Sequence, residues 1–227
     1  MLHREYLVSA KARHSNVNSV LAGNFSESKP FLVLPYLEGI SLRRLIDNRA
    51  VALHMLSTSY ALLLVRQLAE ALAALHAAGW LHGQVNTEHM IVSPHAHATL
   101  IDLTLARRLD SHECDYGGEQ NHRAATYAAP ESFSSRRRIT AAADIYSLGI
   151  VLFELLAGHP PFVAKSLRQL AICHQTHVPP DLRQLRPGLS HEPAELVRRM
   201  LAKEPLRRPS TDQLIRWLTE LEIQALA

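Results

Sequence analysis

The chain has 227 residues, of which 47% are hydrophobic and 20% are charged, and its formal net charge is +3. This length fits one large domain or two small ones, and the composition excludes a disordered protein. The small net charge offers no case for a nucleic-acid partner, two cysteines are too few for a disulfide framework, and no apolar run reaches the roughly 18 residues of a membrane helix. We expect a cytoplasmic protein with no nucleic-acid or membrane partner.

The N-terminal part of the chain predicts a helix followed by two strands. Residues 2–13 have the pattern of a short helix, and a strand is expected near residues 19–22. Residues 31–39 form an apolar run that ends in a turn, which is typical of a second strand. Ser41 is a favourable N-cap residue, and we expect it to begin a short helix over residues 42–46.

A long amphipathic helix is predicted next. It begins at residue 58 or 59, continues to residue 78, and is stopped by Gly79. A polar loop over residues 80–89 follows, and two short apolar strands, 90–92 and 99–103, then flank a turn. A hairpin of this kind brings the loop close to whatever follows its second strand.

Four polar side chains should meet at that place. They are His82, Gln84, His89 and Asp102. Imidazole, amide and carboxylate groups can act as ligands or as bases, so their expected convergence marks a candidate site.

The second half of the chain is predicted to be mainly helical. Residues 102–129 are polar and without a clear period, and this segment is longer than an ordinary connection. Residues 141–156 would form a helix that is apolar on nearly every side and ends at Gly158, and such a helix must lie inside a helical body. Two further helices are expected over residues 193–201 and 211–220.

Five motifs in order resemble those of the eukaryotic-type Ser/Thr protein kinases. Residues 82–89 read H-G-Q-V-N-T-E-H where that family has the catalytic loop H-R-D-L-K-x-x-N, and residues 102–104 read D-L-T in place of D-F-G. Residues 126–131 (T-Y-A-A-P-E), 144–149 (D-I-Y-S-L-G) and 204–209 (E-P-L-R-R-P) are similar to the family's Y-x-A-P-E, D-x-x-S-L-G and D-P-x-x-R-P. Each match is weak alone, but their order and spacing make the resemblance specific.

The resemblance implies an α+β protein-kinase-like fold. Residues 1–40 would be the remnant of the N-lobe with the hinge, consisting of a helix like the family's αC and two strands, and residues 41–227 the mostly helical C-lobe. The Gly-rich loop and the strand with the ATP-contacting Lys are not among these residues, so we expect an N-terminally truncated domain. Glu5 would hold the position of the ion-pairing Glu of αC, without its Lys.

Four further residues are assigned structural roles by the resemblance. His82 would lie under the catalytic loop, and Asp144 would accept hydrogen bonds from the backbone of that loop. Glu131 and Arg208 would form an ion pair, and losing one partner of a buried pair leaves a charge uncompensated.

The resemblance also marks where a nucleotide and a metal ion would bind. Leu34 would be the gatekeeper residue, and the connector that adenine touches would include Tyr36 and Leu37. Asp102 would hold one metal ion, and His89 stands where the family has its second metal ligand, an Asn. The cofactor implied is Mg-ATP, if any nucleotide binding remains.

Several positions depart from the chemistry of the family. Gln84 replaces the catalytic Asp, and an amide cannot accept a proton; Asn86 replaces the Lys that contacts the transferred phosphate. Ala124 replaces a Thr that contacts both of those positions, and Thr104 replaces the Gly of D-F-G. Imidazole at His89 is a poor partner for Mg²⁺, which prefers oxygen ligands.

Three functions are consistent with this pattern. The first is a catalytically impaired pseudokinase that acts as a regulatory or scaffolding module and binds a protein partner, since the strand at 31–39 would have an unpaired edge. The second is a Ser/Thr protein kinase that transfers the ATP γ-phosphate to protein hydroxyls, with its N-lobe missing from this chain. The third is a remnant of gene decay.

Overall fold

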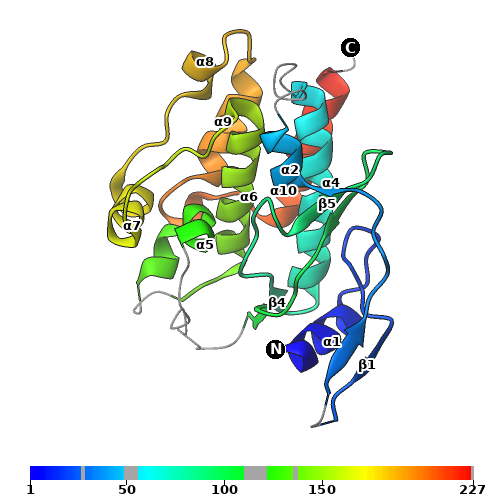
Figure 1. The fold of residues 1–227 in the computed structure, drawn as a ribbon. Coiled ribbons are helices and arrows are strands. Elements are labelled where there is room, and N and C mark those ends of the chain that lie inside the picture. The colour runs from blue at the N-terminus through cyan, green and yellow to red at the C-terminus, as the bar shows by residue number, and fades with distance from the viewer. Residues whose placement is uncertain (27–28, 49–55, 110–121, 135–137, 226–227) are drawn as a thin grey trace.

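A computed structural model describes residues 1–26, 29–48, 56–109, 122–134 and 138–225 (Figure 1). The middle of the polar segment predicted over residues 102–129, residues 110–121, therefore lies outside the described residues. The helices are α1 (Leu2–Lys11), α2 (Leu42–Asp47), α4 (Thr58–Ala77), α5 (His122–Tyr127), α6 (Ala141–Ala157), α7 (Leu167–Thr176), α8 (Leu182–Leu185), α9 (His191–Met200) and α10 (Thr211–Gln224), with 3₁₀ turns η1 (Pro130–Phe133) and η2 (Pro205–Arg207). The strands are β1 (Ala22–Asn24), β2 (Phe31–Val33), β3 (Ile40–Ser41), β4 (Trp80–Leu81), β5 (Met90–Val92), β6 (Ala98–Leu100) and β7 (Arg107–Arg108).

Helix α6 is the centre of a helical body. Its residues from Ala143 to Leu156 are all buried, as the apolar sequence predicts, and it contacts α4, α9 and α5 (Figure 1). Gly158 ends the helix in the left-handed conformation at φ +81°, which glycine adopts without a steric penalty. Gly149 lets α9 approach closely, because a Cβ at this position would lie 2.8 Å from the Cβ of Met200.

Helix α4 begins and ends as its sequence predicts. The Ser57 side chain caps it by accepting a hydrogen bond from the Tyr60 N–H, and Gly79 follows its end at φ +82°. By length and composition alone α4 is apolar enough to cross a membrane. It packs between α6 and α10 and buries residues such as Leu68 and Leu72, so we interpret it as a core helix.

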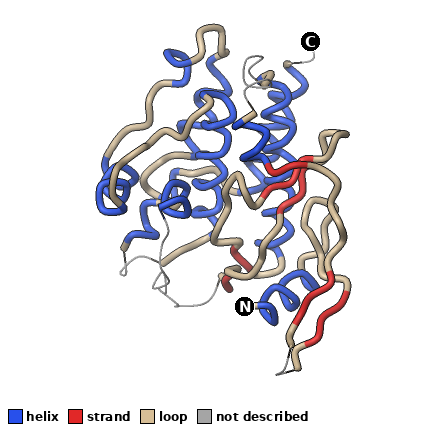
Figure 2. Tube along the Cα trace, in the orientation of Figure 1, coloured by secondary structure: helices blue, strands red, loops and turns tan. Residues whose placement is uncertain are grey.

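The described strands form small antiparallel sheets along one side of the helical body, as Figure 2 shows. In the three-stranded sheet β5 lies between β3 and β6, with Ile40 opposite Val92 and Met90 opposite Leu100. The predicted hairpin is therefore present, although its second strand ends at Leu100 instead of residue 103. Strands β4 and β7 form a second antiparallel pair, and the polar loop continues from the end of β4.

The N-terminal strands are shorter than predicted and differently placed. The first was expected near residues 19–22, but the Val20 N–H bonds the side chain of Ser9, and the β1–β2 ladder begins only at Ala22. The second was expected over residues 31–39, but β2 ends at Val33. Pro35 has no N–H to donate to a ladder, which limits the strand.

The other predicted helices agree with the structure to within a few residues. Ser41 caps α2 by accepting a hydrogen bond from the Arg44 N–H. Helix α10 starts with a capping box between Ser210 and Gln213 and extends to Gln224, beyond the predicted residue 220. Helices α5, α7 and α8 were not predicted, and the segment that contains α5 has no apolar period.

Candidate functional site

The polar loop after β4 is held from below by Asp144 of α6. One carboxylate oxygen accepts a hydrogen bond from the His82 N–H at 2.9 Å, and the other accepts one from the Gly83 N–H at 2.9 Å. His76 of α4 also contacts this carboxylate, at 2.9 Å from Nε2. Burial alone raises the pKa of Asp144, but the bond with His76 lowers it overall. The predicted contact with the loop backbone is thus present.

His82 lies fully buried beneath the loop. Its Nδ1 accepts a hydrogen bond from the Gln84 N–H at 3.2 Å, and its Nε2 lies 3.1 Å from the Ile101 carbonyl oxygen. The first contact makes Nδ1 an acceptor, so Nε2 carries the proton. Burial lowers the pKa of His82, which favours this neutral form. His82 links the loop to the end of the hairpin.

Asn86 uses its side chain to shape the loop. Its Oδ1 accepts from the N–H groups of Glu88 at 2.8 Å and His89 at 3.2 Å, and its Nδ2 donates to the Gln84 carbonyl at 3.0 Å. The residue is only 6% exposed. Asn86 is therefore committed to the backbone around it and is not free to contact a substrate.

His89 and Asp102 meet above this loop. His89 Nε2 lies 3.3 Å from one carboxylate oxygen of Asp102, and His89 Nδ1 lies 3.0 Å from the Gln84 carbonyl oxygen. The other Asp102 oxygen accepts hydrogen bonds from the N–H and the hydroxyl of Thr104. Burial raises the pKa of Asp102, and the contacts with Thr104 and His89 outweigh this and lower it. Of the four residues predicted to meet here, His89 and Asp102 are in contact, and Gln84 joins them through its backbone carbonyl.

Asp102 also has an unusual backbone. Its φ is +64°, in the left-handed region that non-glycine residues rarely adopt, although Asp tolerates it better than most. Strained positions of this kind concentrate at functional sites. The conformation turns the Asp102 carboxylate back toward the Thr104 N–H.

Glu5 of α1 approaches the same place from the other side. It is 7% exposed, and burial raises the pKa of its carboxyl, with an opposing contribution from the Leu103 N–H and a further rise from the nearby charge of Asp102. Glu5 makes no ion pair with any described residue. Helix α1 is thus placed directly on the residues that follow β6.

The residues predicted to contact adenine lie on the connection between β2 and β3. Leu34 is 39% exposed and Tyr36 is 92% exposed, while Leu37 is half-buried. Tyr36 therefore faces solvent and not a packed interior. Among the described residues, no hydrogen bond or ion pair joins these three side chains to Asp102.

Sequence reasoning missed a buried hydrogen-bond network on the far side of the loop. The Tyr127 hydroxyl donates to Glu154 at 2.6 Å and lies 2.8 Å from the Thr87 hydroxyl, and Arg43 donates to the other Glu154 oxygen at 2.5 Å. Burial raises the pKa of Tyr127, and Glu154 raises it further. The four residues come from four segments, so no local pattern indicated their contact.

Glu131 and Arg208 form a bidentate ion pair under the helical body. The two distances are 2.7 and 2.8 Å, and both side chains are fully buried. The guanidinium also lies over the Tyr146 ring, 4.8 Å from its centroid. The predicted pair is present, and it fastens the segment after α5 to η2.

Comparison with known proteins decides the family. The model of the protein kinase domain matches residues 1–217. The chain belongs to the protein kinase family. It is 36% identical over 183 residues to the serine/threonine-protein kinase PknD of Mycobacterium tuberculosis, which covers 78% of this chain and 26% of PknD. It is 32% identical over 222 residues to the serine/threonine-protein kinase PkaA of Streptomyces coelicolor, which covers 95% of this chain and 38% of PkaA.

For a protein kinase, the cluster at Asp102 is where Mg²⁺ would be expected. Mg²⁺ takes oxygen ligands in octahedral geometry. Here the two carboxylate oxygens of Asp102 contact Thr104 and His89, and the second ligand position is an imidazole. In the described part of the chain, no group of three or more His, Cys, Asp or Glu side chains is arranged to hold a metal ion. The residues do not fit the metal pair of the family.

Proposed function

We propose that this protein kinase domain does not transfer phosphate and acts as a regulatory or scaffolding module that binds another protein. The observation that carries the proposal is the contact between His89 and Asp102 at 3.3 Å. It places an imidazole where a cation would sit against the carboxylate. The Thr104 N–H donates a hydrogen bond to the other carboxylate oxygen, so both oxygens of Asp102 already have partners within the chain.

The loop supports the same conclusion at the two positions that handle the acceptor group. Gln84 carries an amide, which cannot remove a proton from a hydroxyl. Asn86 is neutral, and its side chain is taken up by hydrogen bonds within the loop. Neither residue supplies the base or the positive charge that phosphoryl transfer uses.

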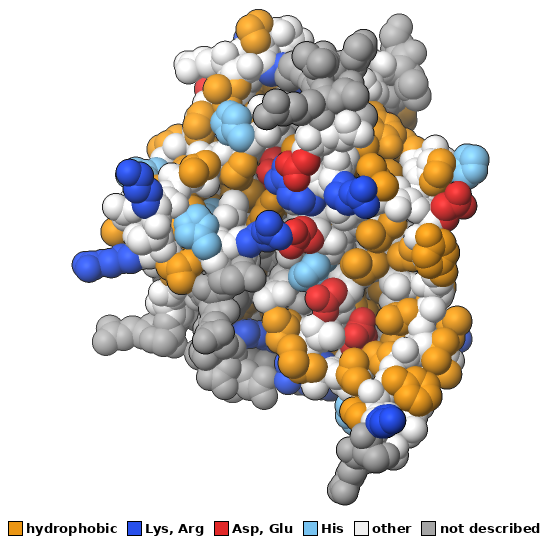
Figure 3. Space-filling model, in the orientation of Figure 1, with side chains coloured by type: hydrophobic (Ala, Val, Ile, Leu, Met, Phe, Trp, Pro, Cys, Tyr) orange, Lys and Arg blue, Asp and Glu red, His pale blue; other side chains and the backbone are white. Residues whose placement is uncertain are grey.

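Exposed apolar side chains on β1, β2 and the residues beside them support a protein-binding role. Leu21 is 66% exposed, Phe31 51%, Val33 42% and Phe25 40%. Figure 3 shows hydrophobic side chains gathered on the lower right of this face, where Figure 1 places α1 and β1. A contiguous apolar patch on a soluble domain marks an interaction surface.

A Ser/Thr protein kinase is the second candidate, and Asp102 favours it. The relatives named above are serine/threonine-protein kinases, and this chain keeps the aspartate of the metal motif together with Asp144 beneath the loop. On this reading Gln84 would orient the acceptor hydroxyl without taking its proton.

A thermal-shift comparison with and without Mg²⁺ tests the first proposal. We expect the melting temperature with ATP to be the same whether or not Mg²⁺ is added, whereas His89→Asn should gain a Mg²⁺-dependent rise because it frees Asp102 and adds an oxygen ligand. His95→Asn is the matched control, since His95 lies in the exposed turn between β5 and β6. A Mg²⁺-dependent rise in the unaltered chain would contradict the proposal.

A phosphate-transfer assay separates the two candidates. Incubation with γ-labelled ATP and peptides that carry Ser or Thr should leave the peptides unlabelled. Labelling that Gln84→Ala abolishes would establish the second candidate, because only a residue that acts in the transfer would have this effect.

A further inference from the structure

The separation of His89 and Asp102 matches that of two ligands on one metal ion. The Nε2 atom of His89 lies 3.3 Å from a carboxylate oxygen of Asp102. A charge-assisted hydrogen bond between such groups is shorter, about 2.7–2.9 Å. An ion that is about 2.0–2.1 Å from an imidazole nitrogen and about 2.0–2.2 Å from a carboxylate oxygen, at a tetrahedral angle, sets these two atoms about 3.3 Å apart. The pair is therefore spaced for a shared ion.

The β5–β6 hairpin fixes this separation. His89 directly precedes β5, and Asp102 follows the end of β6 by two residues. The Ile101 N–H donates to the His89 carbonyl at 2.9 Å, which continues the pairing of the two strands past their ends. The hydrogen bond from the Thr104 N–H orients the Asp102 carboxylate. Ligands that are positioned before the ion arrives lose less entropy when they bind it.

The other ring nitrogen of His89 is held by the polar loop. Nδ1 lies 3.0 Å from the Gln84 carbonyl oxygen and 3.1 Å from the Asn86 amide nitrogen, which donates to the same carbonyl. A proton on Nδ1 that bonds this carbonyl leaves the lone pair of Nε2 for an ion. Metal-binding histidines almost always have such a contact on the opposite ring nitrogen, since it fixes the tautomer and the ring orientation.

The donor set and its exposure select the kind of ion. The side chains of His89 and Asp102 are 19% and 36% exposed, so an ion can enter from solvent and water can complete its coordination. Mg²⁺ prefers oxygen ligands, whereas an imidazole with a carboxylate suits Zn²⁺ and its neighbours in the transition series. Within the described ranges no third His, Cys, Asp or Glu side chain completes a metal-binding set, so the site has two protein ligands.

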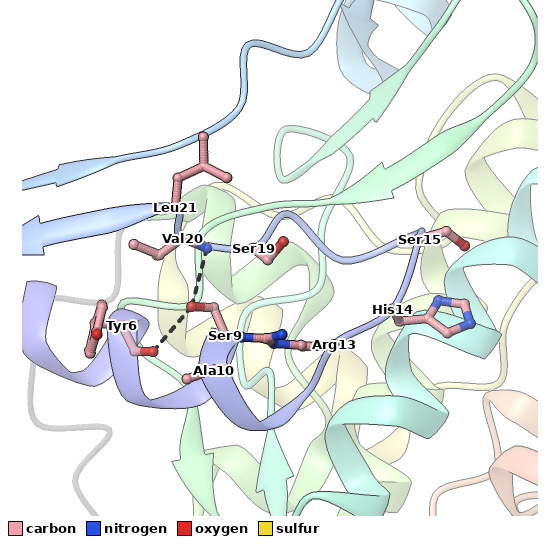
Figure 4. A pocket seen from close by; sticks show the side chains of 9 residues that line it. All are labelled: Tyr6, Ser9, Ala10, Arg13, His14, Ser15, Ser19, Val20 and Leu21. Atoms are coloured by element: carbon pink, nitrogen blue, oxygen red, sulfur yellow. Dashed lines mark hydrogen bonds between the residues drawn. The ribbon is translucent and has the colours of Figure 1, made fainter.

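The pocket behind α1 holds a histidine in the opposite environment. His14 and Arg13 both line this pocket, and none of its lining residues is acidic (Figure 4). Nδ1 of His14 accepts a hydrogen bond from the Asn16 N–H at 3.2 Å. A cation there would meet a guanidinium charge and no carboxylate. His14 is therefore a suitable control for a histidine that is not part of a metal site.

We propose that His89 and Asp102 bind a transition-metal dication of the Zn²⁺ class in place of Mg²⁺. The ion joins the polar loop to the end of the hairpin, and water fills its remaining positions. The inference rests on the proposed function, in which this site no longer holds Mg²⁺, and it names the kind of ion that the site takes instead.

Isothermal titration calorimetry without nucleotide, on the chain without an affinity tag, measures the affinity. The unaltered chain should bind Zn²⁺, and an excess of Mg²⁺ should not displace it. His89→Asn and Asp102→Asn should each weaken the tightest binding event by at least about tenfold, since loss of an outer-shell contact alone costs about 10–100-fold in metal affinity. His95→Asn and His14→Asn remove histidines outside the site and should leave the affinity unchanged.

Paramagnetic Co²⁺ locates the ion in the unaltered chain without any substitution. The first equivalent should perturb the NMR amide signals of Met90 and Leu103, which adjoin the two ligands, before those of His95 and Ser15. The reverse order, or a control variant that weakens Zn²⁺ binding as much as His89→Asn, would overturn the site. Absence of Zn²⁺ binding would also overturn it. That outcome would leave the proposed function standing, because the thermal-shift comparison with Mg²⁺ is a separate measurement.

Discussion

Arg208→Ala is the substitution from which we expect the largest loss of stability. The guanidinium has five N–H donors, and the structure gives each one an acceptor. Two reach the oxygens of Glu131, and the others reach the carbonyl oxygens of Ala202, Ala142 and Lys203. Removing the side chain leaves a fully buried carboxylate without a side-chain partner among the described residues, and three carbonyl groups with one hydrogen bond fewer.

The size of the effect follows from this arrangement. Breaking a buried ion pair by removing one partner lowers the free energy of unfolding by about 3–5 kcal/mol. Glu131→Gln should have a smaller effect, about 1–3 kcal/mol, because Arg208 keeps its three carbonyl acceptors and the new amide still fills the space. The order of the two variants is therefore part of the prediction.

Urea unfolding followed by circular dichroism measures both variants. Arg198→Ala is the control, since Arg198 pairs with Glu195 on the exposed surface of α9, where such a pair contributes about 0–1 kcal/mol. A loss below about 1 kcal/mol for Arg208→Ala, or a loss equal to that of the control, would refute the reasoning from burial.

Three other substitutions test separate parts of the fold by the same unfolding measurement. Burial raises the pKa of Asp144, but the bond with His76 lowers it overall, below the ordinary value of 3.8. The ionised carboxylate therefore stabilises the fold above pH 3.8, and this stabilisation is lost as the pH falls through the pKa of the folded state. Asp144→Asn should make the stability less dependent on pH below about pH 4. Tyr127→Phe removes the hydrogen bond to the buried Glu154 and should destabilise by about 1–3 kcal/mol. Gly149→Ala should destabilise by about 1–3 kcal/mol despite the better helix propensity of Ala, because its Cβ would clash with Met200; an increase in stability would show that α9 can move aside.

The parts of the fold that local sequence determines were predicted well. A run that is apolar on every side and ends in glycine indicates a central helix, and α6 is that helix. The Ser41 cap depends on one side chain and its next few neighbours, and it is present. The strands before α2 were predicted less well because the contact of Val20 with Ser9 ends the pairing, and no local signal marks such a contact.

The sequence predicted where the candidate site lies, but it did not predict the hydrogen bonds within the site. Motif spacing brings His89 and Asp102 together, and the structure does the same. Motif spacing could not show that Thr104 donates hydrogen bonds to the other carboxylate oxygen of Asp102. Nor could it show that the Asn86 side chain bonds the backbone of the loop. Both depend on the left-handed backbone at Asp102 and on the turn within the loop, which the residue types allow but do not require.

The contrast between α6 and the β1–β2 ladder has a consequence for how the molecule opens. Residues Ala143 to Leu156 of α6 are buried, whereas all three residues of β1 are exposed. Exchange and proteolysis should therefore proceed in steps, with the N-terminal helix and ladder detaching long before the helical body melts. A protein that captures this edge changes only the first of these steps. A protein that bound this edge would therefore leave the exchange of the α6 amides unchanged.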